Sequence, residues 1–139
     1  MSEPYRYRVY WEDTDAGGVV YHARYLHFLE RARSDWLLRL GFPQISLRER
    51  DNRLFVVTSL QMEFLAPARL EDELAVGVAV EQLRAVSMRM AQTVTGPGNR
   101  LLLTAKISIA CLAADSFRPA RMPRRLHAAV ADYQRNQNE

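Results

Sequence analysis

The stretch WEDTDAGGVVYHARYL, residues 11–26, contains most of the side chains in this sequence that could do chemistry. They are two carboxylates, a glycine pair and an aromatic–imidazole pair: Asp13, Asp15, Gly17, Gly18, Tyr21 and His22. If a helix begins near His22, its free backbone N–H groups can bind an oxyanion that develops on a carbonyl. The glycine pair lets a ligand approach the backbone, and an upstream carboxylate could attack the carbonyl or activate a water. Acyl transfer requires both an oxyanion-binding group and such a carboxylate.

The same residue types also have a purely structural interpretation. Asp13 or Asp15 could cap a turn, the glycine pair could supply positive φ angles, and His22 could be an incidental residue of the first helical turn. Residue types alone do not separate the two interpretations.

Other chemistry-bearing residues are less favourably spaced. His22 and His27 are five positions apart, so on a helix they point about 140° away from each other and form no metal pair. Glu30 lies about 12 Å along the axis from His22, too far to act at the helix start, and an ion pair with Arg31 or Arg33 is its simpler role. The sequence has no Gly-x-Ser-x-Gly elbow, P-loop or dinucleotide-binding glycine motif. Serine hydrolases of that type and nucleotide-dependent enzymes are therefore disfavoured.

The hydrophobic pattern predicts the elements that position this stretch. Residues 5–12 alternate as a half-exposed strand does, and apolar residues recur at helical spacing from about His22 to Leu40, where Gly41 and Pro43 end the helix. The later elements are four strands and a short helix before a frayed tail, at about 54–65, 73–83, 86–95, 100–113, 123–133 and 134–139. A single long helix followed by an antiparallel meander predicts an α+β fold.

Length and composition are those of one globular domain, residues 1–139, with 48% hydrophobic and 25% charged residues. No apolar run could span a bilayer and the N-terminus has no signal-peptide segment, so we expect a cytoplasmic protein without a transmembrane segment. The net charge of +3 comes from scattered arginines, which excludes nucleic acid as an expected partner. The single cysteine, Cys111, lies in an apolar run and should be buried.

Two motifs resemble those of a known family. VYWEDTDAGGVVYHARYLHFLERAR, residues 9–33, closely resembles the signature of hotdog-fold acyl-CoA thioesterases of the hydroxybenzoyl-CoA thioesterase family. It is most similar to the YbgC type, whose members are often associated with the Tol–Pal envelope system. MEFLAPARLEDEL, residues 62–74, is similar to the family's second marker. The resemblance covers the chain to about Pro123, and it implies a hotdog fold in which an antiparallel sheet of about five strands wraps one long central helix.

By motif position, the resemblance also implies roles for the residues of the first stretch. The catalytic aspartate falls on Asp15, and both the polarising backbone N–H and the family's histidine fall on His22. Asp13 is then structural and ties down the turn. The substrate-binding loop residues match Gly17, Gly18 and Tyr21.

The resemblance therefore implies an enzyme that hydrolyses acyl-CoA to a free acid and CoA, with CoA as part of the substrate and no cofactor or metal. Asp15 would act as a nucleophile or as a general base, and the sequence leaves both routes open. Two alternatives remain: a hydrolase of acyl carrier protein thioesters, and a catalytically idle scaffold that binds acyl thioesters. The Asp15–His22 pair argues against the scaffold, because binding alone requires no carboxylate beside the carbonyl.

The strand at 54–65 is long, apolar and free of proline, so an unpaired edge there would need protection. The family joins such edges between subunits. We therefore expect a homo-oligomer, at least a dimer and preferably a tetramer, in which neighbouring chains complete each site.

Overall fold

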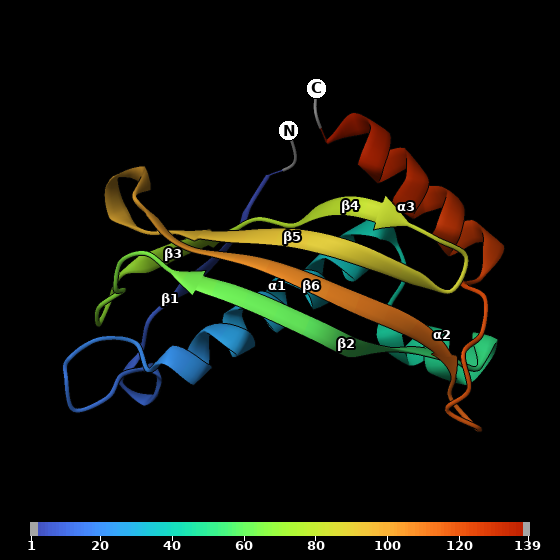
Figure 1. The fold of residues 1–139 in the computed structure, drawn as a ribbon, viewed down its shortest axis with the longest axis horizontal. Coiled ribbons are helices and arrows are strands. Elements are labelled where there is room, and N and C mark those ends of the chain that lie inside the picture. Colours follow the sequence, from blue (N-terminus) through green and yellow to red (C-terminus); the bar gives the residue numbers. More distant parts are fainter. Residues whose placement is uncertain (1–2, 138–139) are drawn as a thin grey trace.

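A six-stranded antiparallel sheet lies against one long helix in the computed structural model, which describes residues 3–137 (Figure 1). The strands are β1 (Tyr5–Arg8), β2 (Arg53–Phe64), β3 (Glu73–Val76), β4 (Ala79–Leu83), β5 (Ser87–Thr95) and β6 (Leu101–Ala113). Their order is β1–β3–β5–β6–β2, and β4 continues β3 along β5. The predicted α+β fold is confirmed. The count is six rather than about five because the strand predicted at 73–83 is interrupted at residues 77–78.

The long helix is α1 (Tyr25–Leu40), preceded by a 3₁₀ turn, η2 (His22–Arg24). Its buried stripe follows three- and four-residue spacing and packs on the sheet: Tyr25, Phe28, Leu29, Ala32, Trp36 and Leu37. Gly41 ends the helix with a φ of 97°, as predicted, and the N–H of Phe42 donates to the carbonyl of Leu37. Helix and sheet thus share one apolar core, in which Cys111 is buried as expected.

Two local predictions were wrong. The polar segment after Pro43 forms a second helix, α2 (Gln44–Asp51), which was missed because only Leu47 of its eight residues is buried. The first strand ends at Arg8 rather than residue 12, because the chain turns through a 3₁₀ turn, η1 (Trp11–Asp13). That turn is closed by the N–H of Asp13, which donates to the carbonyl of Tyr10.

A C-terminal helix, α3 (Arg124–Asn136), runs along the outer edge of β4 (Figure 1). The amide of Gln137 bonds both the N–H and the carbonyl of Val80, and the hydroxyl of Tyr133 donates to the carbonyl of Val78. Residues 134–136, expected in a frayed tail, are therefore helical, while 138–139 lie outside the described residues. This contact protects one edge of the sheet.

On the opposite side of the sheet lies β2, which pairs with β6 and with no other strand of the described residues. None of the twelve residues of β2 is buried. None of the helices within residues 3–137 combines the length and the apolar character needed to cross a membrane.

Candidate active site

The candidate loop is a tight hairpin that ends at the start of η2. Thr14 and Val20 form an antiparallel bridge, and the N–H of Tyr21 donates to the carbonyl of Asp13 at 2.9 Å. At the tip, the N–H of Gly18 donates to the carbonyl of Asp15. Gly18 has a φ of 81°, a backbone conformation that a side chain would strain. The hairpin therefore has a defined shape set by its own backbone hydrogen bonds.

Asp13 points into the protein and holds this hairpin. Its side chain is almost fully buried and accepts two hydrogen bonds of 2.8 Å, from the N–H of Tyr10 and from Nε of Arg24. The Asp13 carboxylate in turn raises the pKa of Arg24. Arg24 belongs to η2, so the ion pair ties the beginning of the hairpin to the helix start, which is the turn-holding role expected of Asp13.

Asp15, two residues later, is exposed on the tip of the hairpin. One carboxylate oxygen accepts a hydrogen bond of 2.8 Å from the N–H of Gly17. A Cβ atom at Gly17 would lie 3.2 Å from that oxygen, so a side chain there would crowd the carboxylate. The Asp15 carboxylate is thus oriented by its own loop and otherwise open to a ligand.

His22 opens the helical turn, and its backbone N–H has no acceptor among the described residues, as is usual for the first residue of a helix. Its imidazole packs on two aromatic rings, Tyr21 at 4.6 Å and Phe64 at 6.4 Å between centroids. Phe64 also contacts Tyr25. A free donor therefore lies beside an aromatic surface at the end of α1 that faces the hairpin.

The second sequence motif anchors the hairpin from outside. The carbonyl of Ala68 accepts from the N–H of Val20 at 2.9 Å, and the N–H of Ala68 donates to the hydroxyl of Tyr25 at 3.1 Å. The N–H of Arg69 donates to the carboxylate of Asp72 at 2.9 Å, which closes the acidic turn of this motif. The two motifs are far apart in sequence, but these hydrogen bonds join them in space.

The predicted residues fall into two groups within the hairpin. Asp15, Gly17 and Gly18 form the tip, whereas Tyr21 and His22 form the helix start, and no hydrogen bond joins Asp15 to His22 within the described chain. Sequence reasoning missed three supporting residues, Arg24, Tyr25 and Phe64. Arg24 could have been found as the first cation after the acidic pair, but the contacts of Tyr25 and Phe64 depend on long-range packing.

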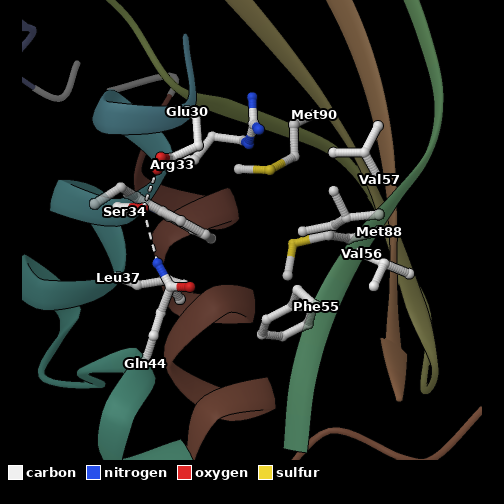
Figure 2. A pocket seen from close by; sticks show the side chains of 12 residues that line it. Glu30, Arg33, Ser34, Leu37, Gln44, Phe55, Val56, Val57, Met88 and Met90 are labelled. Carbon is white, nitrogen blue, oxygen red and sulfur yellow. Dashed lines mark hydrogen bonds between the residues drawn. The ribbon is translucent and has the colours of Figure 1, made fainter. Parts of the chain in front are cut away.

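A cavity of about 330 Å³ lies between α1 and the inner face of the sheet (Figure 2). Its sheet wall is apolar and includes Phe55, Met88 and Met90. On the helix wall, Ser34 donates to Glu30 at 2.5 Å and accepts from Gln44 at 2.7 Å. Glu30 forms no ion pair with either neighbouring arginine among the described residues, contrary to expectation, because Ser34 on the next turn engages its carboxylate.

Strand β2 connects this cavity to the hairpin. Its C-terminal residue Phe64 packs against His22 and Tyr25, and its N-terminal Phe55 lines the cavity with Leu37. Strand and helix therefore run in opposite directions between the hairpin and the cavity.

Comparisons with known proteins agree with this architecture. A model of the thioesterase superfamily matches residues 17–103. The acyl-CoA thioesterase YbgC of Haemophilus influenzae is 42% identical over 123 residues, 88% of this chain and 89% of that protein. The crystal structure of a probable thioesterase from Bartonella henselae is 36% identical with a TM-score of 0.81, and the match covers 86% of this chain and 97% of that one.

A 1,4-dihydroxy-2-naphthoyl-CoA thioesterase from Synechocystis, 24% identical, superposes with a TM-score of 0.86 over 94% of this chain and 96% of that one, a likeness of fold. These matches confirm the hotdog fold and the family that the two motifs predicted. The chain belongs to the thioesterase superfamily.

Proposed function

We propose that this protein is an acyl-CoA thioesterase. The thioester carbonyl of the substrate binds at the start of η2 and is attacked from the hairpin tip. The observation that carries the proposal is that one hairpin presents an exposed, oriented Asp15 carboxylate and leads into η2, where the backbone N–H of His22 has no acceptor among the described residues. The N–H stabilises negative charge on the carbonyl oxygen. The carboxylate supplies the second part that acyl transfer requires.

The reaction has two possible courses with the same products. Asp15 attacks the thioester carbon and forms a mixed anhydride that water then hydrolyses, or it removes a proton from a water molecule that attacks the same carbon. In both, the carbon–sulfur bond breaks and CoA leaves as a thiol. The His22 imidazole, held by the rings of Tyr21 and Phe64, orients the thioester or assists the leaving sulfur.

The cavity between α1 and the sheet accommodates the end of the acyl group. The acyl chain then runs from His22, past Phe64, toward Phe55 and Met88. Apolar walls favour the hydrocarbon part of an acyl chain. Gly17, Gly18 and Tyr21 form the mouth near the thioester. CoA enters as part of the substrate, and the proposal includes no further cofactor or metal.

The proposal includes a homo-oligomer, because β2 exposes apolar side chains along an unpaired edge. Val57, Leu60 and Phe64 are 49%, 41% and 51% exposed, and their strand partners on β6 face the core. A second copy of the strand would cover them and complete the acyl-binding site. A dimer is the minimum assembly, and a tetramer is preferred.

The cellular setting follows from the same resemblance of the hairpin motif to the YbgC type. We place the protein in the cytoplasm, associated with the Tol–Pal system, with no nucleic-acid partner. Acyl carrier protein remains an alternative carrier of the acyl group, and a catalytically idle scaffold remains the alternative of a different class.

A thiol-release assay with the purified protein tests the proposal. Acyl-CoAs of graded chain length and the matching acyl carrier protein thioesters are supplied as substrates, and free acid is measured beside released thiol. We expect saturable hydrolysis of CoA thioesters with one acid formed per thiol. Hydrolysis of carrier-protein thioesters alone would select the first alternative. Saturable binding without thiol release would identify a scaffold and overturn the proposal.

A further inference from the structure

The cavity between α1 and the sheet contains an arginine that the proposed reaction does not use. Figure 2 shows the side chain of Arg33 extending from α1 toward the sheet, beside Met90. Arg33 is largely buried, and this burial lowers its pKa, but a guanidinium remains charged in proteins. No carboxylate of the described residues lies within ion-pair distance of it, and its one hydrogen bond there, 3.0 Å long, goes to Gln92. Removing a cation even partly from water is costly when its donors have no partner.

Gln92 is built to hold that guanidinium in place. It is 1% exposed on β5, and its amide nitrogen donates to the carbonyls of Leu29 and Gly77 at 3.1 and 3.4 Å. The amide oxygen is then left to accept from Arg33. The orientation of the guanidinium is therefore set by the backbones of α1 and of the segment after β3, before any ligand enters.

A second residue with an unpaired donor lines the same cavity. Trp36 lines it, is buried, and its indole N–H is the one buried side-chain polar atom in residues 3–137 without a hydrogen-bond partner. Trp36 follows Arg33 by three positions on α1, so the two residues share a helix face. On the same helix wall, Ser34 joins Glu30 to Gln44. The guanidinium N–H groups of Arg33 that do not bond Gln92, and the indole N–H of Trp36, have no acceptor among the described residues.

We propose that Arg33, held by Gln92, is a specificity-determining residue that binds an oxygen atom on the acyl group, so that the enzyme prefers oxygen-bearing acyl chains to plain alkyl chains of equal length. This inference rests on the proposed thioesterase function and deepens it. The oxygen is an uncharged hydroxyl or carbonyl, because the Glu30 carboxylate lines the same cavity, interacts with the charge of Arg33 over a longer distance, and would repel an acid.

The position of that oxygen follows from the helix. Arg33 lies eleven positions after His22, about 16 Å along the axis, and helical side chains lean back toward the N-terminus by about one turn. The guanidinium is then roughly 11 Å from the helix start. Carbon–carbon bonds of ~1.5 Å in a zigzag cover that distance with about eight or nine carbons.

The test compares kcat/KM for octanoyl-CoA with that for ω-hydroxyoctanoyl-CoA. We expect the wild-type protein to prefer the hydroxylated substrate by about tenfold or more, since a site with donors placed for an oxygen discriminates against the analogue that lacks it. Arg33→Met keeps the length of the stem and removes the donors, so it should lower that ratio toward one. Arg31→Met is the matched control on the exposed side of α1 and should keep the wild-type ratio.

The wild-type ratio decides the matter even if Arg33→Met fails to fold. Equal kcat/KM values for the two substrates, with both hydrolysed, would overturn the role of Arg33 and leave the proposed function standing. A preference that persists in folded Arg33→Met would also overturn it. Hydrolysis of neither CoA thioester, nor of any other in the panel, would mean that the proposed function itself had failed.

Discussion

At the scale of single residues, two aspartates of the same hairpin have opposite environments. Asp13 is buried and accepts hydrogen bonds from Tyr10 and Arg24, whereas Asp15 is exposed and contacts only its own loop through Gly17. A buried carboxylate that already pairs with an arginine is poorly placed to attack a substrate. The structure therefore favours Asp15 as the reactive group and Asp13 as the residue that holds the hairpin.

Replacing Asp13 with Asn should lower the free energy of unfolding by about 1–3 kcal/mol, because the Arg24 guanidinium loses its charged acceptor. Urea denaturation followed by circular dichroism measures this change. Turnover should fall less than it does on loss of Asp15. A variant as stable as the wild type would show that the ion pair does not hold the hairpin.

His22→Ala should retain part of the activity, because the backbone N–H that polarises the carbonyl remains when the imidazole is removed. The loss in kcat should be smaller than that caused by replacing Asp15. Steady-state kinetics on one acyl-CoA, with both variants side by side, makes the comparison. An equal and nearly complete loss in both would assign essential acid–base work to the imidazole.

At the scale of elements, the sequence predicted the helix and strands that are encoded by the spacing of nearby apolar residues and by turn residues. The long helix, its end at Gly41 and four later strand regions were predicted from spacing and turn residues, with the third region split into β3 and β4. Helix α2 was missed because one buried leucine gives no periodicity. The shared clamp at Ala68, which joins the two motifs, was invisible because it links residues more than forty positions apart.

That clamp gives an element-scale prediction. Tyr25→Phe removes the hydroxyl that accepts from the N–H of Ala68 and leaves this buried donor unpaired, which should cost about 1–3 kcal/mol of stability. Because Ala68 also holds Val20, the hairpin should loosen and kcat should fall. Tyr5→Phe is the control, since the Tyr5 hydroxyl has no hydrogen bond among the described residues. Equal stability and equal kcat in both variants would show that the Tyr25–Ala68 hydrogen bond does not hold the hairpin.

At the scale of the whole molecule, β4 and β2 lie on opposite sides of the sheet, and one is covered while the other is open. Helix α3 covers β4, but β2 exposes both its backbone edge and the apolar side chains of Val57, Leu60 and Phe64. The single chain therefore leaves these apolar side chains uncovered, including Phe64 beside His22. Sequence reasoning identified this strand as the open edge but not which side chains it exposes, because that depends on how far α1 extends over the sheet.

Light scattering should find a homo-oligomer at assay concentrations. A dimer is the smallest assembly expected, and a tetramer is expected ahead of a dimer. Leu60→Lys places a charge on the open edge and should shift the protein toward monomer with a parallel loss of activity. Leu38→Lys changes an exposed leucine on α1, away from this edge, and should change neither the oligomeric state nor the activity. A fully active wild-type monomer of 16.0 kDa would contradict the prediction, whereas an active dimer would remove only the tetramer.

The turnover of Asp15→Asn on acyl-CoA is the measurement that tests the central claim most directly. The substitution keeps the size of the side chain and an oxygen for the N–H of Gly17, but removes the carboxylate that attacks or activates water. With unchanged circular dichroism and thermal unfolding, kcat should fall by at least about 100-fold, the scale of losing one catalytic group. A folded Asp15→Asn variant that turns over at the wild-type rate, beside a folded but inactive Asp13→Asn variant, would contradict the assignment.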